Sequence, residues 1–399
     1  MSATLYFYVR PTDSLFIRGN LAFGDSGEHG ASQMPPPPSL FAGAFRSAIL
    51  GQNAQHMAQF LASQPLADEA RARCLGSYAQ PGEFRLSWLS LAGQADGQAT
   101  PEAVSPLPAD LVVLGKAFAP LIPRSVAAGI ASAGELPMRA TLFSAKQEKP
   151  STGIYLRGTG LQDHLTGKLP GAAAQVAAGH LFHRDPRLGI GLNADSRTAQ
   201  ESLIYTTEGF AFGPGAACDG KASPFASTGF LVGMEGVADV LPAQGSLRLG
   251  GDGRSAHYQR VEFKPPVAAN LAANKRFRLV LQSPALFSQG WLPDGVVQQD
   301  GLYQLQLRGA GLTARLACAA IGRREVVSGW DLHGWMPKPA QAVAPAGSVY
   351  WFDEFEGDVG KLAAWAQGGL WAENLDTMDT TQIMRRAEGY NLALLGAWN

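Results

Sequence analysis

The run Met34-Pro35-Pro36-Pro37-Pro38-Ser39-Leu40-Phe41-Ala42-Gly43-Ala44-Phe45-Arg46 joins a stiff extended segment to an abrupt helix start. Proline fixes φ and removes a backbone donor, so the four prolines predict a polyproline-like lead-in. Ser39 is the expected N-cap, because its hydroxyl can accept a hydrogen bond from the first turn. Gly43 is a poor helix former, which indicates that something passes close to the backbone there. The run predicts a capped helix whose start offers a phosphate site, or alternatively a packing helix with a solvated Arg46.

The length and composition predict a loop-rich α+β protein of two domains. The chain has 399 residues, more than one domain usually contains. Charged residues make up only 16% of it, and its 47 glycines and 26 prolines indicate short elements joined by turns. The N-terminal residues alternate like a strand and have no signal-peptide pattern, and no apolar stretch is as long as a membrane span. We therefore expect a cytoplasmic protein without membrane contact.

Hydrophobic patterning predicts the order of the elements. Strands are expected at residues 3–9, 84–91 and 111–114, and helices from Ser39 and at 54–61, 67–74 and 358–367. The order strand, helix, strand, strand begins a ferredoxin-like βαββαβ unit. Residues 116–180 are predicted to be inserted loops and small elements, and residues 187–192 and 202–212 a long hairpin. We place the domain boundary between 1–218 and 219–399.

The charges are segregated along the chain. The net charge is −1, yet the segment from Arg248 to Arg278, which includes Lys264, holds seven basic residues against two acidic ones. A local basic surface attracts a phosphate backbone whatever the total charge. The alternative is a solvated face.

Two further sites carry possible phosphate contacts. Gly250 and Gly251 begin a turn in which backbone N–H groups could converge into an anion-binding nest beside Arg254, unless the segment is only a tight strand turn. The predicted hairpin concentrates side-chain donors at His183, Arg184, Arg187 and Arg197. Single-stranded RNA is read by such donors and by stacking.

Five stretches in series resemble one family: the proline-rich helix entry, RLGIGL at 187–192 with LIY at 203–205, LRLGGDGR at 247–254, SPALF at 283–287 with GW at 290–291, and PAGSVY at 345–350. Together they are similar to the RAMP protein that forms the third subunit of the type III-B CRISPR effector, the Cmr complex. The resemblance covers nearly the whole chain. One departure is the C-terminal loop, where Asn391 stands at a position for which the family usually has glycine, although asparagine can adopt the same left-handed conformation.

The resemblance implies two ferredoxin-like (RRM-like) RAMP domains with long loop and hairpin insertions. It also implies a non-catalytic, RNA-binding role in antiviral defence, with the repeat-derived 5′ handle of the guide CRISPR RNA, a large cyclase-type subunit and a backbone RAMP subunit as partners. The candidate RNA-binding residues are Arg18, Ser39, Gly43, Arg46, His183, Arg184, Arg187, Arg197, Gly250, Gly251, Arg254 and Lys264. The candidates for a protein interface are Trp335 and Lys338.

Catalysis is the main alternative. A RAMP-type endoribonuclease without a metal would need a histidine general base, and His29, between glycines 27 and 30, is the candidate. No second catalytic group is evident beside it. The three cysteines are widely spaced, so no metal site and no cofactor are expected. A loop-rich metabolic enzyme is disfavoured because no catalytic constellation is visible.

Overall fold

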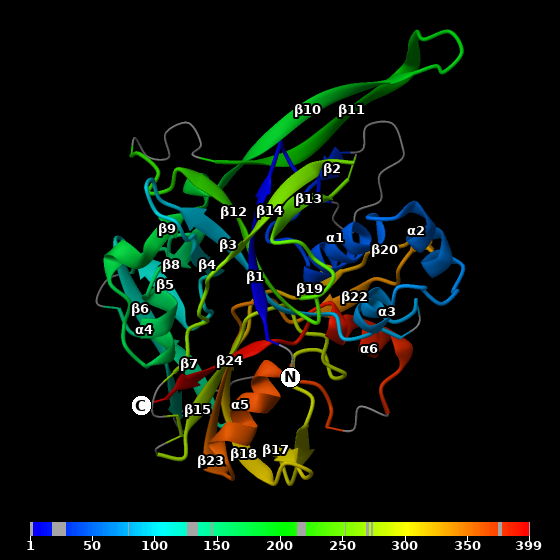
Figure 1. Ribbon diagram of the computed structural model, residues 1–399. Helices are drawn as coiled ribbons and strands as arrows, with labels where there is room; N and C mark the ends of the chain where they lie inside the picture. The colour runs from blue at the N-terminus through cyan, green and yellow to red at the C-terminus, as the bar shows by residue number, and fades with distance from the viewer. Residues whose placement is uncertain are drawn as a thin grey trace.

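The computed structural model describes residues 3–17, 29–78, 80–125, 135–144, 147–213, 221–251, 253–268, 271–272, 274–373 and 377–398. Two large antiparallel sheets form the body, one in the upper and one in the lower half of Figure 1. The first sheet has the order β13 (Gln244–Arg248), β14 (Ser255–Val261), β1 (Leu5–Pro11), β12 (Ser227–Glu235), β3 (Arg85–Gln94), β4 (Glu102–Pro106), β8 (Ile154–Arg157) and β9 (Gln175–Ala177). The second has the order β16 (Val296–Gln299), β17 (Leu302–Leu307), β18 (Leu312–Ala320), β23 (Val349–Glu356), β15 (Phe277–Leu281) and β24 (Ala393–Ala397).

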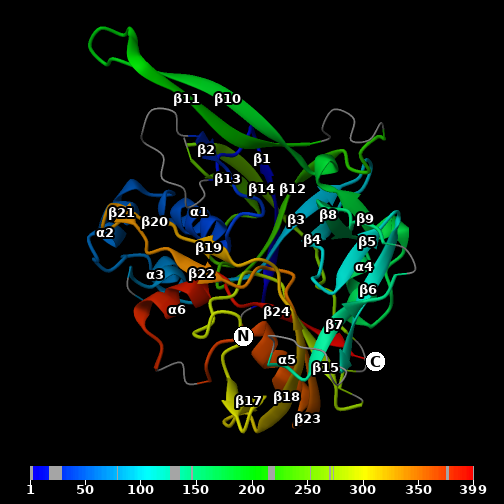
Figure 2. The same ribbon diagram turned by 180° about the vertical axis from the view of Figure 1, so that it is seen from behind.

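Smaller elements surround these sheets. The helices are α1 (Pro38–Leu50), α2 (Ala54–Leu61), α3 (Glu69–Leu75), α4 (Gly160–Leu165), α5 (Val359–Gln367) and α6 (Thr380–Ala387). The minor strand groups are β5 (Leu111–Leu114), β6 (Ala117–Ser125) and β7 (Met138–Leu142); β10 (Phe182–Leu192), β11 (Ala199–Phe212) and β2 (His29–Ala31); β19 (Glu325–Val327) with β22 (Gln341–Val343); and β20 (Trp330–Asp331) with β21 (Met336–Pro337). The predicted mixed α+β class and the predicted hairpin are confirmed, and β10 and β11 project from the body (Figures 1 and 2).

Strand alternation distributes the side chains between three large cores. In β1, Phe7 and Val9 pack with α1 on one face of the first sheet, while Tyr8 faces the other way. In β23, Tyr350 belongs to the core under α5, while Trp351 joins Tyr8 in a third core. This third core contains side chains of both sheets, so the sheets pack back to back.

A buried polar network joins the second sheet to α4 and to the residue before β5. Asp110 Oδ2 accepts a hydrogen bond from Arg278 Nη1 of β15 at 2.5 Å, and Asp110 Oδ1 lies 2.8 Å from His164 Nε2 of α4. Arg278 also donates to the Ala397 carbonyl of β24. Burial alone would raise the pKa of Asp110, but His164 and Arg278 together lower it below its ordinary value.

The pairing of β1 corrects two details of the prediction. The strand at Leu111–Leu114 was expected as the third strand of the ferredoxin-like unit, but it belongs to a small separate sheet. The neighbour of β1 in that position is β12. The other neighbour of β1 is β14. Both of these strands come after residue 218 in the chain, yet they belong to the first sheet. The predicted boundary between residues 218 and 219 therefore does not separate the two sheets. In the sequence, the first sheet ends with β14 and the second begins with β15. The physical reason is that antiparallel pairing depends on matching edges in space and not on closeness in the chain.

Candidate nucleic-acid interface

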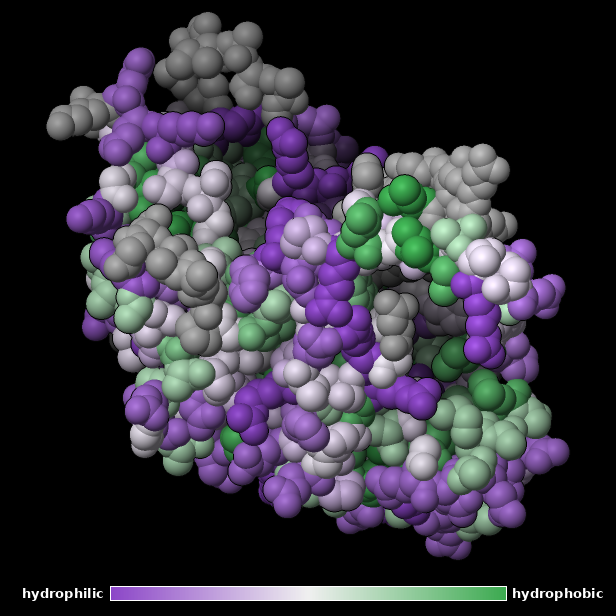
Figure 3. All heavy atoms as spheres, turned by 90° about the horizontal axis from the view of Figure 1, so that it is seen from above, coloured by the Kyte–Doolittle hydropathy of each residue, from purple (hydrophilic) through white to green (hydrophobic). Residues whose placement is uncertain are grey.

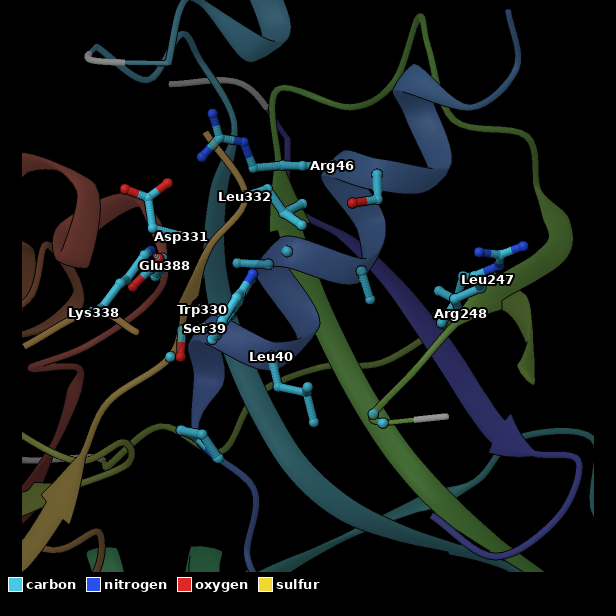
Figure 4. Close-up of a pocket in the computed structure, with 18 of the residues that line it drawn as sticks. Ser39, Leu40, Arg46, Leu247, Arg248, Trp330, Asp331, Leu332, Lys338 and Glu388 are labelled. Carbon is cyan, nitrogen blue, oxygen red and sulfur yellow. Dashed lines mark hydrogen bonds and ion pairs between the residues drawn. The ribbon is translucent and has the colours of Figure 1, made fainter. Parts of the chain in front are cut away.

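An open groove of about 1630 Å³ runs over the outer face of α1 (Figure 4). Its floor is the helix, with Ser39 and Leu40 at one end and Arg46 towards the other. One wall is the segment 325–343 around β20 and β21, which we call the flap, together with Glu388 after α6. The opposite wall is the end of β13 with the turn that follows it, including Arg248. Of the predicted site residues, the groove brings together Ser39, Gly43, Arg46, Gly250, Gly251 and Lys338.

The centre of the floor is bare helix backbone. Phe41, Ala42, Ala44 and Phe45 are buried towards the sheet, whereas Gly43 is exposed. A Cβ atom built at Gly43 would meet no atom within 4 Å. Glycine weakens a helix and no neighbouring atom requires it here, so packing within the described residues does not explain Gly43.

The start of α1 differs from the prediction. The N-cap is Pro37, whose φ and ψ are −66° and 146°, and Pro38 occupies the first turn. Proline suits that position because its missing N–H would have no helical partner. Ser39 is therefore inside the helix, and its hydroxyl lies 3.1 Å from the Tyr390 hydroxyl. The predicted N-cap role of Ser39 is wrong.

Arg46 is a largely buried cation in the groove. Its guanidinium lies 5.6 Å from the Phe60 ring centroid and makes one long hydrogen bond, 3.5 Å, to the Leu75 carbonyl. No carboxylate of the described residues lies within ion-pair distance of it. Burial lowers the pKa of Arg46, while the more distant Glu388 raises it. A desolvated cation without a close counterion favours an anionic ligand.

The acids of the groove are occupied by other partners. Glu388 accepts from Lys338 Nζ at 3.1 Å and from Arg385 Nη1 at 2.9 Å. Asp331 Oδ1 accepts from the amides of His333 and Gly334 within the flap. Burial would raise the pKa of Asp331, but its hydrogen bonds with Tyr78 and these amides lower it. Lys338 is therefore paired with Glu388, and among the described residues that line the groove the cations left for a ligand are Arg46 and Arg248.

At the glycine turn, one amide of the predicted nest is already occupied. The Gly251 amide donates to the Phe16 carbonyl at 2.8 Å, so it is not available to an anion. Gly250 has a φ of +80°, and a Cβ atom there would lie 2.7 Å from the same carbonyl oxygen. The glycines thus permit a close approach to Phe16. Arg254 forms an ion pair with Asp13, and its guanidinium lies 5.2 Å from the Phe16 ring centroid.

The hairpin holds four of the predicted RNA contacts. Arg184 pairs with Glu208, and Arg187 pairs with Asp13 and Asp185. His183 and Arg197 are exposed, the latter at the tip with a φ of +56°. Large apolar side chains are also exposed on one face of the hairpin: Leu188, Ile190, Leu192 and Ile204. Figure 3 looks down on this end of the molecule and shows a group of hydrophobic side chains among hydrophilic ones.

The remaining candidates lie elsewhere. Lys264 is exposed and lines a separate cavity of about 580 Å³ with Glu102 and Glu262. Arg18 and the side chain of His29 lie outside the described residues, although the backbone of His29 pairs with Thr206 as part of β2. Trp335 is 74% exposed on the flap.

The C-terminal loop is structural. Asn391 has a φ of +64°, as expected for the residue that replaces glycine, and it is fully buried. Its Oδ1 accepts from the Leu286 amide at 2.6 Å. Gly389 packs so closely on β3 that a Cβ atom would lie 2.6 Å from a methyl carbon of Leu86. The loop therefore has no free face for RNA at these two residues.

The site prediction omitted two groove residues, Arg248 and Trp330. Arg248 begins the basic segment, and Trp330 belongs to a stretch of the sequence that also contains Trp335 and Trp351. The pairing that brings β13 and the flap to opposite sides of α1 is not encoded in local sequence, so these residues could not be singled out. Within the described residues, no group of three or more histidine, cysteine or acidic side chains could hold a metal ion, and no helix is long and apolar enough to cross a membrane.

The fold and the site together define a strand-rich α+β protein that has two packed sheets and an open groove, lined by cations, over helix α1. The chain belongs to the CRISPR-associated Cmr3 protein family (Cas_Cmr3), whose sequence model matches residues 7–398. This confirms the resemblance found in the sequence motifs. No curated protein matches the chain.

Two solved structures are similar to the chain over most of its length. One is a chain of the type III-B Cmr-beta structure bound to cognate target RNA and AMPPnP, with 14% identity and a TM-score of 0.46, covering 97% of this chain and 95% of that one. The other is from Cmr-beta bound to cognate target RNA, with 14% identity and a TM-score of 0.47, covering 97% and 96%.

Proposed function

We propose that this chain is a non-catalytic, RNA-binding subunit of a type III-B CRISPR effector complex in the cytoplasm, and that it holds the repeat-derived 5′ handle of the guide RNA in the groove over α1. The observation that carries the proposal is the largely buried Arg46, which has no carboxylate of the described residues within ion-pair distance, beside the bare backbone of Gly43. Phosphate is an anion that a guanidinium binds well, and the missing side chain at Gly43 lets a nucleic-acid backbone approach the helix. Membership of the Cmr3 family supports a guide CRISPR RNA as the ligand that we propose.

The same proposal includes two protein partners, the large cyclase-type subunit and a backbone RAMP subunit. Trp335 is the candidate anchor for a protein contact, since exposed tryptophans are frequent hot spots at interfaces. Lys338 supports the flap through Glu388 and would contribute to such a contact indirectly.

We further propose that each sheet is the core of a ferredoxin-like domain. In such a domain the first strand lies between the third and the fourth, and the second strand pairs with the third. The orders β14-β1-β12-β3 and β18-β23-β15-β24 agree with that arrangement. Among the described residues, α1 follows the first strand of one sheet and α5 the third strand of the other, so each sheet keeps one of the two expected helices.

Binding of labelled handle RNA to the full chain tests the groove. The variant Arg248→Ala should weaken binding and reduce the dependence of log affinity on log salt by about 0.7, the amount expected for one lost phosphate contact on a single strand. The matched control is Arg308→Ala, an exposed arginine in the turn between β17 and β18, which should change neither quantity. Equal effects of the two substitutions would contradict the groove assignment.

The complex itself tests the class of RNA. The tagged chain, purified gently from its native cells, should carry small RNAs that share one repeat-derived 5′ handle, together with a large protein. Recovery of the folded chain without RNA or partners would contradict the subunit proposal.

A further inference from the structure

The flap presents large apolar side chains to solvent on a supported frame. Trp330 is 45% exposed and Trp335 is 74% exposed, and Leu332 and Met336 are exposed as well. Such side chains normally find cover in a folded protein, so a group of four on one short segment marks an interaction surface. Of these four, Trp330 and Leu332 line the groove.

Contacts at the tip and the base hold the flap in place. At its tip, His333 Nδ1 donates to the Leu61 carbonyl of α2 at 2.9 Å, and the His333 ring lies 4.5 Å from the Tyr78 ring. At its base, Ser328 Oγ donates to the Lys338 carbonyl at 2.7 Å, and Lys338 binds Glu388. The flap is therefore held on both sides of Trp330. These contacts keep the indole at the groove even when no ligand is bound.

The indole of Trp330 retains surface for stacking. Its ring and that of Trp335 meet edge to face, with centroids 5.8 Å apart and planes at 88°. Such a pair covers at most one face of one ring. Trp335 has a φ of +49°, a conformation that a tryptophan adopts only when its surroundings hold it, and residues of this kind concentrate at functional sites.

We propose that Trp330 is a base-stacking residue, and that it takes one unpaired nucleobase of a single-stranded RNA whose phosphates lie along α1 between Arg46 and Arg248. This inference rests on the proposed RNA-binding function of the groove. It adds that the RNA must be single-stranded where a base stacks on Trp330. A base in a duplex has both faces covered by its neighbours, so only an unstacked base can meet the indole.

The charges of the groove favour a nucleic acid over an apolar peptide as the occupant. Arg46 and Arg248 line the groove together with Trp330 (Figure 4), and neither has a carboxylate of the described residues within ion-pair distance. The charge of Glu388 is balanced by Lys338 and Arg385, and the Asp331 carboxylate, although still ionised, is held by hydrogen bonds from the flap amides. An aromatic platform beside cations that follow the backbone is the usual construction of a single-strand site.

The test compares binding of a short mixed-sequence single-stranded RNA to the full chain and to three variants. Trp330→Ala should weaken binding roughly 5- to 100-fold, since one base stacked on an aromatic side chain contributes about that much. Trp330→Phe should restore most of the affinity. The matched control is Met336→Ala, an exposed apolar residue of the same flap outside the groove lining, which should leave affinity unchanged.

A second readout separates stacking from support of the fold. Trp330→Ala should leave the salt dependence of binding unchanged, because no phosphate contact is lost, and an RNA with an abasic nucleotide at the stacked position should bind both proteins equally. If Trp330→Ala binds like the wild type while Arg248→Ala is weakened, stacking is refuted and the RNA groove stands. If neither substitution matters, both proposals fall. If Trp330→Ala instead releases a partner subunit without changing RNA affinity, the flap is a protein-docking surface and the stacking proposal is refuted.

Discussion

The hydroxyl groups of Ser39 and Tyr390 lie 3.1 Å apart and join the first turn of α1 to the C-terminal loop, across 351 positions of the chain. Tyr390 is completely buried, and burial raises its pKa to about 12, so the phenol stays neutral and available as a donor or acceptor. This contact fixes the end of the groove floor to the part of the chain that follows α6.

The Ser39 and Tyr390 contact predicts coupled effects on stability. Ser39→Ala and Tyr390→Phe should each lower the free energy of unfolding by about 1 kcal/mol, because each leaves one hydroxyl of a partly buried pair without its partner. The double variant should lose less than the sum. Chemical denaturation of the four proteins gives the coupling energy, and strict additivity would mean that the two hydroxyls do not interact.

Substitution of Gly43 should separate stability from binding. Gly43→Ala should raise the free energy of unfolding by up to about 1 kcal/mol, because alanine favours the helix and its methyl group meets no atom. Gly43→Leu should cost about tenfold in RNA affinity, or about 1.4 kcal/mol, because its side chain would fill the floor of the groove. Thermal unfolding and RNA titration measure the two effects. Unchanged RNA binding by Gly43→Leu would mean that no ligand crosses the helix there.

Two glycines of one turn form a matched pair. Gly250 and Gly253 both have positive φ, +80° and +64°, but only Gly250 would place a Cβ atom against the Phe16 carbonyl. Gly253→Ala should cost about 1–2 kcal/mol for the left-handed backbone alone. Gly250→Ala should cost more, and equal losses of stability on denaturation would argue against the close approach.

The buried network predicts a pH-dependent stability. The pKa of Asp110 in the folded protein is below its ordinary value of 3.8, so its stabilising effect is complete above that value and is lost as the pH falls through the folded pKa. Asp110→Asn should lower the free energy of unfolding by about 3 kcal/mol near neutral pH, because Arg278 loses its buried partner. The difference from wild type should shrink in acid.

Denaturation at a series of pH values checks this expectation. The control is Asp195→Asn at the exposed hairpin tip, which should change stability by less than about 0.5 kcal/mol at any pH. A gap between Asp110→Asn and wild type that stays constant down to strong acid would contradict the assignment.

The nuclease alternative has a direct test. On the proposed non-catalytic role, His29→Ala should leave both complex assembly and the processing of CRISPR RNA unchanged. Sequencing of the RNA ends in cells that carry the variant measures this. Loss of processing with assembly intact would establish the alternative, in which this histidine acts as a general base.

Local patterns in the sequence predicted individual elements well. Helix α2 has its predicted bounds, Ala54–Leu61, and β10 and β11 contain the predicted hairpin strands, although β10 already begins at Phe182 and β11 at Ala199. Asn391 has the left-handed backbone expected of it. These features depend on neighbours in the chain, which the sequence displays directly.

Contacts between distant segments were not predicted, because they depend on residues that are not neighbours in the chain. The N-cap of α1 is Pro37 and not Ser39, because Pro38 fits the first turn of the helix. The Ser39 hydroxyl instead contacts the hydroxyl of Tyr390, which is far along the chain. The amide of Gly251 donates a hydrogen bond to the Phe16 carbonyl and is therefore not available to a ligand. The groove depends on a flap and a turn that only the tertiary pairing places on either side of α1.

The position of β1 between β12 and β14 has a consequence during synthesis on the ribosome. When the first 218 residues have been made, β1 has neither of the strands that flank it in the finished sheet, because both come later in the chain. Its two edges then expose unpaired backbone groups, and such edges promote aggregation. Both edges of β1 are covered only once Val261 has been made, so we expect a fragment cut near residue 218 to aggregate on expression.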